Sequence, residues 1–257
     1  MTDVTEVSSD SVDLRLVADA THWERLASLS RLERLWCFRI NAARMTAIAR
    51  CHSLKRLYLD GVRTPIDALR DLRHLAVFSL DSATRLASLE EVPAFECLEG
   101  LAIINAPKVG SLRPLRERSG LEALAVSGGM WSRMTVDTLE PLRDLTGLRY
   151  LNLQNLTVLD GSLEPLADLT GLRTLDLPNF YPIEEFARLA ARLKQTACTW
   201  FAPAVDLPNV RCRRCGELSL VVLTGKGLPT LCKRCDDRRL GEHVDYFRHL
   251  VASSARH

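Results

Sequence analysis

Two segments of the chain are nearly identical, and this repetition constrains the fold more than any other feature of the sequence. Residues 139–153 read LEPLRDLTGLRYLNL, and residues 163–177, which begin 24 positions later, read LEPLADLTGLRTLDL. Leucine recurs in both at steps of three residues that end in a step of two. A unit of this length cannot bury its apolar edge by itself and has to stack on similar units. The sequence therefore predicts a solenoid, an architecture that offers a long surface for binding.

Related units occupy most of the chain. Further leucines in steps of three precede the core of each unit, and they predict short 3₁₀ or α segments that lead back to the next strand. We therefore expect an α/β solenoid in which each unit gives one short parallel strand and one return segment. The cores follow the pattern LxxLxL or a close variant, at intervals of 19 to 27 residues, and begin at Leu35, Leu54, Leu75, Leu98, Leu121, Leu148 and Leu172.

The units resemble those of leucine-rich-repeat proteins, and LEPLADLTGLRTLDL is similar to the short repeats of internalin-like bacterial proteins. The resemblance covers residues 21–185, and it implies parallel strands on a concave face and a binding scaffold more than an enzyme. One departure is the ninth position of each unit, where the family usually has an asparagine that satisfies backbone groups of the turn. Without it we expect irregular coil with another source of hydrogen bonds. The residues found there are Ala43, Val62, Ala83, Ala106, Gly129, Leu156 and Phe180.

Three parts are expected along the chain. Residues 1–20 form a flexible N-terminal tail and the start of a cap, residues 21–206 the repeat array with its terminal caps, and residues 207–257 a zinc-binding module. The leucine period ends where the third part begins, which is the reason for this boundary.

Both ends of a solenoid need a cover. At the N-terminal end, the sequence predicts a strand at residues 12–16 and a helix that begins near Trp23. At the C-terminal end, helical spacing of apolar residues predicts an amphipathic helix over residues 183–193, followed by a strand at residues 198–201.

Strand residues that alternate with the buried leucines face outward, onto the predicted concave face. We expect a central ladder of such residues to meet a protein partner. An insertion, GGMWSRM, places Met130 and Trp131 in a loop after one strand, and we expect them to lie close to Tyr150 and to form a hot spot with it. The other residues expected to bind the partner are Arg39, Tyr58, Ser79, Asn152 and Asp176.

Four of the eight cysteines form two CxxC pairs separated by sixteen residues: Cys212, Cys215, Cys232 and Cys235. This spacing is typical of a four-thiolate zinc site. Since cysteine fills all four positions, the predicted Zn²⁺ is a single structural ion with no open site for catalysis. The intervening residues predict a hairpin and the following residues a helix, an order that resembles a treble-clef module, with a zinc ribbon as the nearest alternative.

The C-terminal part of the chain is basic. Residues 207–257 contain ten Lys or Arg and five Asp or Glu, although the whole chain has a net charge of +2. Basic zinc modules can bind phosphate backbones, so these residues suggest a contact with nucleic acid as an alternative to a solvated surface. The residues around the cysteines are Arg213, Arg214, Lys233, Arg234, Arg238 and Arg239.

The sequence carries no glycine-rich phosphate loop and no nucleophile elbow, so we expect neither enzyme activity nor a small-molecule substrate. It shows no secretory leader and no long apolar run, so we expect no membrane association. The main interpretation is a cytoplasmic adaptor that binds a protein partner on the concave repeat face and carries a structural zinc module. The alternative is a regulator that contacts DNA or RNA through its basic zinc module.

Overall fold

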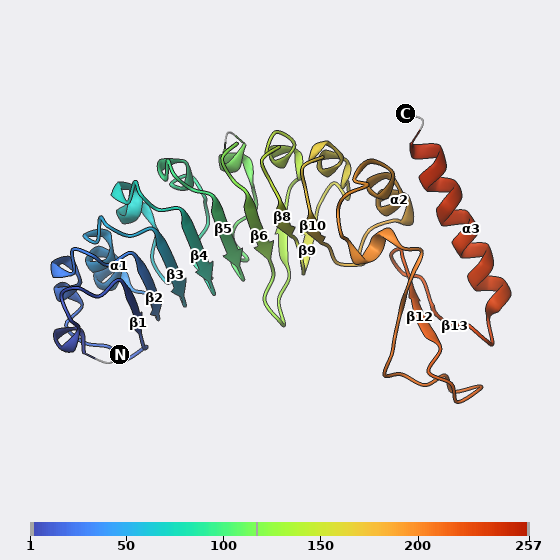
Figure 1. The fold of residues 1–257 in the computed structure, drawn as a ribbon, viewed down its shortest axis with the longest axis horizontal. Coiled ribbons are helices and arrows are strands. Elements are labelled where there is room, and N and C mark those ends of the chain that lie inside the picture. The colour runs from blue at the N-terminus through green and yellow to red at the C-terminus, as the bar shows by residue number, and fades with distance from the viewer. Residues whose placement is uncertain (1–2, 117, 256–257) are drawn as a thin grey trace.

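The computed structural model describes residues 3–116 and 118–255, and its main feature is one long parallel sheet (Figure 1). Its strands lie in the order in which the chain reaches them, as expected for a solenoid, and short helical turns run along one edge of the arch. The strands of this sheet are β1 (Asp13–Leu16), β2 (Arg34–Phe38), β3 (Arg56–Asp60), β4 (Val77–Asp81), β5 (Gly100–Ile104), β6 (Ala123–Ser127), β8 (Tyr150–Asn152) and β10 (Thr174–Asp176).

The core lies between this sheet and the return segments because alternate strand residues are apolar. In β3, Leu57 and Leu59 are buried, whereas the residues between and beside them reach the surface. The parallel register stacks such residues into buried rows, which bury apolar area continuously along the array. One row consists of Leu35, Leu57, Phe78, Leu101, Leu124, Leu151 and Leu175.

Most return segments are single 3₁₀ turns, as the leucine spacing predicts. Four of them have proline at their first or second position, where a missing N–H costs no hydrogen bond. One unit instead uses an α-helix, α1 (Ala42–Ala49), which Asn41 caps by accepting a hydrogen bond from the Arg44 backbone N–H at 3.0 Å. The 3₁₀ turns are Val4–Glu6, Trp23–Ser28, Asp67–Asp71, Val92–Ala94, Arg113–Leu115, Glu140–Leu142, Glu164–Asp168 and Thr199–Phe201.

The turns that follow the strands form backbone hydrogen bonds with the neighbouring repeat unit. The backbone N–H of Gly61 donates to the carbonyl of Asp81 at 3.0 Å, and that of Ser82 donates to Ile104 at 3.1 Å. Four of the residues at the ninth position of the units are buried and extend the core: Val62, Ala83, Ala106 and Leu156. Irregular coil does not follow every strand, however, because β7 (Met134–Val136) and β9 (Leu156–Val158) pair in a separate two-stranded sheet.

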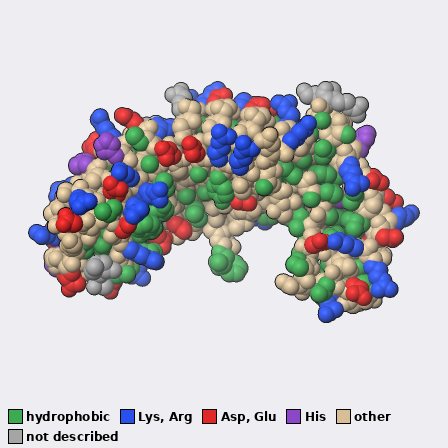
Figure 2. Space-filling view, viewed as in Figure 1, with side chains coloured by type: hydrophobic (Ala, Val, Ile, Leu, Met, Phe, Trp, Pro, Cys, Tyr) green, Lys and Arg blue, Asp and Glu red, His purple; other side chains and the backbone are tan. Residues whose placement is uncertain are grey.

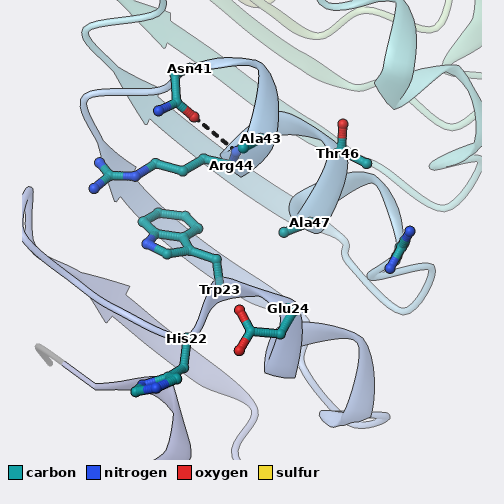
Figure 3. Close-up of a pocket in the computed structure, with 9 residues that line it drawn as sticks. His22, Trp23, Glu24, Asn41, Ala43, Arg44, Thr46 and Ala47 are labelled. Atoms are coloured by element: carbon teal, nitrogen blue, oxygen red, sulfur yellow. Dashed lines mark hydrogen bonds between the residues drawn. The ribbon is translucent and has the colours of Figure 1, made fainter.

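Residues 1–20, predicted to form a flexible tail and the start of a cap, contain the expected N-terminal strand, which is β1. Val4 is buried in the main core, and β1 pairs along its whole length with β2. The predicted helix near Trp23 is a 3₁₀ segment. Figure 3 shows Arg44 above the Trp23 ring, with its guanidinium carbon 4.7 Å from the ring centroid. The Arg44 guanidinium also donates to the carbonyls of Ala18, Phe38 and Arg39. The residues that line the hollow beside it therefore hold the cap to the first repeats.

The C-terminal cap begins with the predicted amphipathic helix, α2 (Ile183–Arg192). The strand expected at residues 198–201 is instead a 3₁₀ turn, and the chain forms β11 (Ala204–Asp206) only after it. The predicted hairpin consists of β12 (Leu220–Leu223) and β13 (Thr230–Cys232), which pair antiparallel. β11 pairs antiparallel with β12. The last element is α3 (Asp237–Ser254). No helix within the described residues has both the length and the apolar character needed to cross a membrane.

α3 packs against α2, so the C-terminal module is joined to the array (Figure 1). Phe247 of α3 is buried and belongs to the same core as the repeats. Two polar contacts flank it: the Tyr246 hydroxyl donates to Glu184 at 3.0 Å, and His243 Nε2 lies 2.9 Å from the carbonyl oxygen of Pro203.

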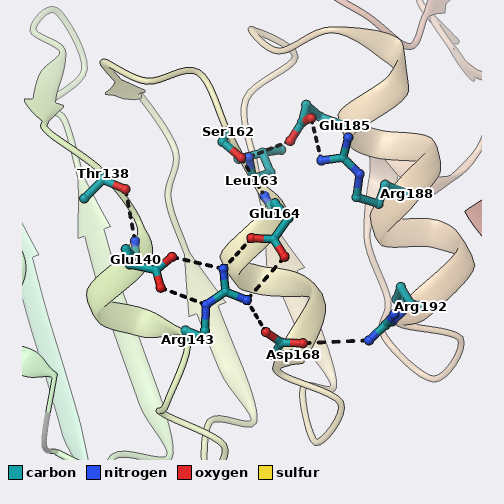
Figure 4. A network of polar contacts seen from close by, with 10 residues as sticks. All are labelled: Thr138, Glu140, Arg143, Ser162, Leu163, Glu164, Asp168, Glu185, Arg188 and Arg192. Atoms are coloured by element: carbon teal, nitrogen blue, oxygen red, sulfur yellow. Dashed lines mark hydrogen bonds and ion pairs between the residues drawn. The ribbon is translucent and has the colours of Figure 1, made fainter. Parts of the chain in front are cut away.

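Ion pairs connect the last repeats to α2 on the side of the return segments (Figure 4). Arg143 pairs with Glu140 in its own turn and with Glu164 and Asp168 in the next one. Asp168 also lies 3.7 Å from Arg192 of α2. The hydrogen bonds from Arg143 lower the pKa of Glu140 below its ordinary value.

Candidate functional site

The strand register places four of the eight predicted partner-binding residues in one row on the outward side of the sheet, and we call this side the sheet face. Tyr58 lies opposite Ser79, and Asn152 lies opposite Asp176. The side chains in the middle of the row are small and apolar, and those toward both ends are polar or aromatic. It consists of Arg15, Trp36, Tyr58, Ser79, Ala102, Ala125, Asn152 and Asp176.

Arg39, predicted to lie in this row, is outside it, and Trp36 occupies its place. Trp36 pairs in register with Tyr58, whereas Arg39 follows the end of β2 in a left-handed turn with a φ of 54°. The prediction was wrong because it began the first unit at Leu35. A start at Leu32, which reads LERLWC with a cysteine in the last buried position, would have found Trp36.

The N-terminal part of the sheet face carries an aromatic stack beside carboxylates. The rings of Trp36 and Tyr58 are parallel within 1°, with centroids 4.7 Å apart. Phe38, Asp60 and Asp81 form the neighbouring row, nearer the C-terminal ends of the strands. These side chains line a hollow of about 210 Å³. Aromatic residues dominate the energetics of many interfaces, so this group is a candidate binding surface. The sequence analysis predicted Tyr58 as part of such a surface but missed Trp36 and Phe38.

The C-terminal part of the sheet face is polar and connected by hydrogen bonds. The Tyr150 hydroxyl donates to Asp176 Oδ2 at 3.2 Å and accepts from Asn152 Nδ2 at 3.2 Å. Asn152 Oδ1 accepts the backbone N–H of Gln154 at 2.9 Å. These contacts fix the orientation of three of the predicted partner-binding side chains.

Met130 and Trp131 project into solvent from residues 128–133, which we call the finger loop. Their exposed fractions are 81% and 94%. Figure 2 shows a hydrophobic projection beneath the middle of the arch, where Figure 1 places the loop after β6. The expected proximity to Tyr150 was wrong: Tyr150 lies opposite Ala123 at the start of β6, whereas the finger loop follows the end of that strand.

The base of the finger loop is held in place by its neighbours. The Ser132 hydroxyl donates to Asn105 Oδ1 at 2.7 Å, and Asn155 donates to a carbonyl within the loop at 3.2 Å. The Arg133 guanidinium lies over the Phe180 ring, 4.2 Å from its centroid. The exposed tip therefore stands on a structured base.

The four cysteines of the two CxxC pairs converge at the C-terminal module. Their sulfur atoms lie within 4.8 Å of one another; Cys215 and Cys232 are 3.7 Å apart, and Cys212 and Cys235 are 4.0 Å apart. A disulfide requires about 2.05 Å, whereas thiolates held about 2.3 Å from a tetrahedral zinc ion are about 3.8 Å apart. The arrangement therefore fits a metal ion and not two disulfides.

Neighbouring donors favour the thiolate form of some of these cysteines. The Ser219 hydroxyl, 3.0 Å from Cys232 Sγ, lowers the pKa of that thiol to about 6. Backbone N–H groups, first that of Cys215, lower the pKa of Cys212. Cys235 has its pKa raised to about 12 because its proton is shared with the nearby Cys215 sulfur. Four thiolates this close repel one another, so a cation is needed to hold them all ionised.

Most of the basic residues near the cysteines are paired with carboxylates. Within residues 3–116 and 118–255, only Arg213 and Arg239 of the six predicted residues form no ion pair. Pairing reduces the charge that is available to a phosphate backbone. The four pairs are Arg214 with Asp236, Lys233 with Asp206, Arg234 with Glu217, and Arg238 with Glu242.

Comparison with known proteins supports the fold. No protein-family model and no curated protein matches the chain. Among solved structures, the plant peptide hormone receptor RGFR1 in complex with RGF2 is similar at 14% identity and a TM-score of 0.51, over 77% of this chain and 35% of the receptor chain. Internalin C2 of Listeria monocytogenes is similar at 19% identity and a TM-score of 0.49, over 58% of this chain and 64% of the internalin chain. The internalin inlF of the same organism is similar at 14% identity and a TM-score of 0.47, over 72% of this chain and 66% of the internalin chain.

The chain spans less than two thirds of the length of each of these three structures. Similarity at such low identity bears on the fold alone. The similarity to the plant receptor, whose TM-score is 0.51, agrees with the stacked parallel strands and with the buried rows of leucine. The chain is therefore a leucine-rich-repeat solenoid that ends in a module with four clustered cysteines.

Proposed function

We propose that the chain is a non-enzymatic scaffold that binds a protein partner along the sheet face and the finger loop. The observation that carries this proposal is Trp131, an indole that is 94% exposed on a loop with a structured base. Burying an aromatic side chain removes about 150–250 Å² from water, so tryptophan is a strong anchor at interfaces. A tryptophan held in solvent this way has little role in packing its own chain.

Two further observations support a protein partner. The sheet face offers the aromatic group at one end and the Tyr150 network at the other, with small side chains between them. The plant receptor of similar fold is, by its description, a peptide hormone receptor in complex with RGF2, so this kind of scaffold can hold a peptide. The paired state of most basic residues favours this function over nucleic-acid binding.

For residues 207–257 we propose a module with one structural Zn²⁺ bound by Cys212, Cys215, Cys232 and Cys235. The sulfur spacing supports zinc, and a thiolate in every position leaves no ligand site for a reacting water. The second CxxC pair directly precedes α3, an order that favours a treble clef over a zinc ribbon. None of the eight cysteines, which all lie within the described residues, forms a disulfide, and paired CxxC motifs are typical of metal sites in a reducing compartment, which supports a cytoplasmic location.

The proposal is tested by capturing partners from a lysate of the source cells with the full chain at low and high salt. The double variant Met130→Ala, Trp131→Ala is expected to lose a protein that the wild type retains at both salt concentrations, with affinity reduced about thirtyfold. Leu159→Ala is the matched control, because Leu159 is 72% exposed but follows β9, outside the sheet face.

Equal capture by the finger-loop variant and the wild type would contradict the role of Trp131. Nucleic acid retained only at low salt, and released by the double variant Arg213→Ala, Arg239→Ala, would instead support the regulator alternative.

A further inference from the structure

The aromatic stack at the N-terminal part of the sheet face has the form of a binding site. Trp36 and Tyr58 lie on neighbouring strands, both half-buried, and their rings stack face to face. The wall that this stack presents toward β4 is therefore the outer face of the Tyr58 ring. The hollow of about 210 Å³ beside this wall is also lined by Phe38, Asp60 and Asp81. The site therefore combines aromatic faces with carboxylates at one edge.

The two carboxylates are available to a ligand. Asp60 and Asp81 face the surface from neighbouring strands, and neither forms an ion pair within the part of the chain that the structure describes. Asp81 accepts one hydrogen bond, from the Ser82 hydroxyl at 3.1 Å. The partly buried position weakens solvent screening, so the charges attract a cation more strongly than fully exposed carboxylates would.

The charge of the outward side chains also changes sign along the strands, and this difference would orient a charged ligand. In β3, the outward residues are Arg56, Tyr58 and Asp60, so the surface runs from positive through aromatic to negative. In β2 the corresponding positive residue, Arg34, is paired with Asp13. A partner side chain that carries positive charge is therefore directed toward the Asp60 edge of the stack.

One arginine of the chain already uses this aromatic group. The Arg15 guanidinium carbon lies 5.4 Å from the centroid of the Phe38 ring. A guanidinium is planar, stacks on aromatic rings and donates paired hydrogen bonds to carboxylates, whereas an ammonium group lacks the planar fork. The chemistry of the hollow matches a guanidinium in both respects.

We propose that this hollow binds an arginine side chain presented by an extended segment of a protein partner, with the guanidinium against the outer face of the Tyr58 ring and hydrogen-bonded to Asp60 and Asp81. The inference rests on the proposed function as a protein scaffold and names the chemistry that one part of its surface recognises. It is independent of the finger loop, which lies after β6.

The probe is the peptide acetyl-Gly-Gly-Arg-Gly-Gly-amide, titrated into the full, zinc-loaded chain, with the corresponding glutamine peptide for comparison. The readout is the indole N–H signal of Trp36 in nuclear magnetic resonance spectra, one of four such signals and assigned with Trp36→Phe. We expect saturable binding of the arginine peptide in the millimolar range and no saturable shift with the glutamine peptide. The lysine peptide is expected to bind more weakly than the arginine peptide.

The variant Asp60→Asn, Asp81→Asn is expected to weaken binding about tenfold, since it removes both charged acceptors but keeps side-chain size. The matched control is Asp67→Asn, Asp71→Asn, which changes net charge equally in a return segment on the other side of the sheet and leaves binding within about twofold. Tyr58→Leu tests the aromatic wall separately and should also weaken binding.

Three results would overturn the proposal: equal shifts with both peptides, equal binding by the Asp60→Asn, Asp81→Asn variant, or a Trp36 signal that follows protein concentration, which would make a second copy of the chain the occupant. Because the capture experiment varies only the finger loop and the basic residues, a failure here leaves the scaffold function standing. A failure of capture does not affect this titration.

Discussion

Gly128 determines the course of the finger loop because a larger residue does not fit there. A Cβ at this position would lie 2.6 Å from the carbonyl oxygen of Asn155 and would also collide with the carbonyl oxygen of Ser132. The Asn155 carbonyl already accepts the backbone N–H of Met134 at 3.0 Å. The Asn155 oxygen therefore cannot move without disturbing the start of β7 beside β9. The exposure of Trp131 therefore depends on a glycine in the loop base.

The substitution Gly128→Ala is expected to destabilise the protein by about 1 to 3 kcal/mol, the usual cost of overpacking. Gly110→Ala is its control, because a Cβ there meets nothing within 4 Å, and it should change stability by less than about 0.5 kcal/mol. Urea unfolding followed by circular dichroism measures both. Equal midpoints for the two variants would show that the loop base adapts to the added methyl group.

The metal ligands and the aromatic stack differ in how visible they are to sequence analysis. The cysteine spacing is local, so the sequence identifies all four residues that the structure brings together. The place of Trp36 depends on the alignment of a unit in which cysteine replaces leucine, and that alignment failed. The exposure of Trp131 depends on contacts with Asn105 and Asn155 from other units, which no local pattern reveals.

At the scale of elements, the two nearly identical repeats, residues 139–153 and 163–177, differ at one position for a structural reason: the first has Arg143 where the second has Ala167. Arg143 in the first repeat reaches across to Glu164 and Asp168 of the second. Its counterpart, Ala167, is buried, and the turn that contains it packs against α2. The exchange of arginine for alanine thus marks the last unit before the cap.

Arg143→Ala is expected to lower the melting temperature at neutral pH, and the difference from wild type is expected to shrink in acid. The pKa of Glu140 is lowered in the folded state, chiefly by its hydrogen bond from Arg143. Such a carboxylate stabilises the fold above its unfolded pKa, about 4.3, and loses this contribution as pH falls through the lower, folded value. Melting curves between about pH 7 and pH 3 measure the effect.

Arg116→Ala is the control, because Arg116 holds the equivalent position one unit earlier and makes one exposed ion pair, 3.6 Å from Asp144. A single exposed pair contributes little, so this variant should melt close to wild type. A difference between Arg143→Ala and wild type that stays constant with pH would show that packing of the arginine stem, and not its charge, is what matters.

The sequence predicts the repeat elements well and the irregular ones less well. Leucine spacing fixes the main strands and the 3₁₀ returns, because burial depends on that period alone. The strands β7 and β9 were missed since each has three residues and pairs only with the other. The predicted strand at residues 198–201 was wrong: the Trp200 indole donates to the carbonyl of Leu177 at 2.8 Å, so this segment closes the core as a turn.

At the scale of the whole molecule, the C-terminal module acts as a cover for the array. The sequence left open whether it does so, because the contact joins segments far apart in the chain. The Asn179 side chain donates to the Leu223 carbonyl at 2.9 Å and accepts the Gly225 backbone N–H at 2.8 Å. Gly225 has a φ of 124° and approaches Ile183 of α2, so only glycine suits this junction. With Phe247 in the core, the module and α2 form one packed end.

Removal of the metal is therefore expected to loosen the C-terminal end of the array as well as the module. One zinc ion per chain is expected by mass, and chelation should speed hydrogen exchange in α3, in β11 to β13 and in α2, which loses its cover. Strands β1 to β4 should keep their protection, since solenoid contacts reach only to the next unit. Phe247→Ala in the zinc-loaded protein should loosen α2 while the metal stays bound, which separates docking from metal binding. Unchanged exchange in α2 after chelation would show that the module covers the array without stabilising it.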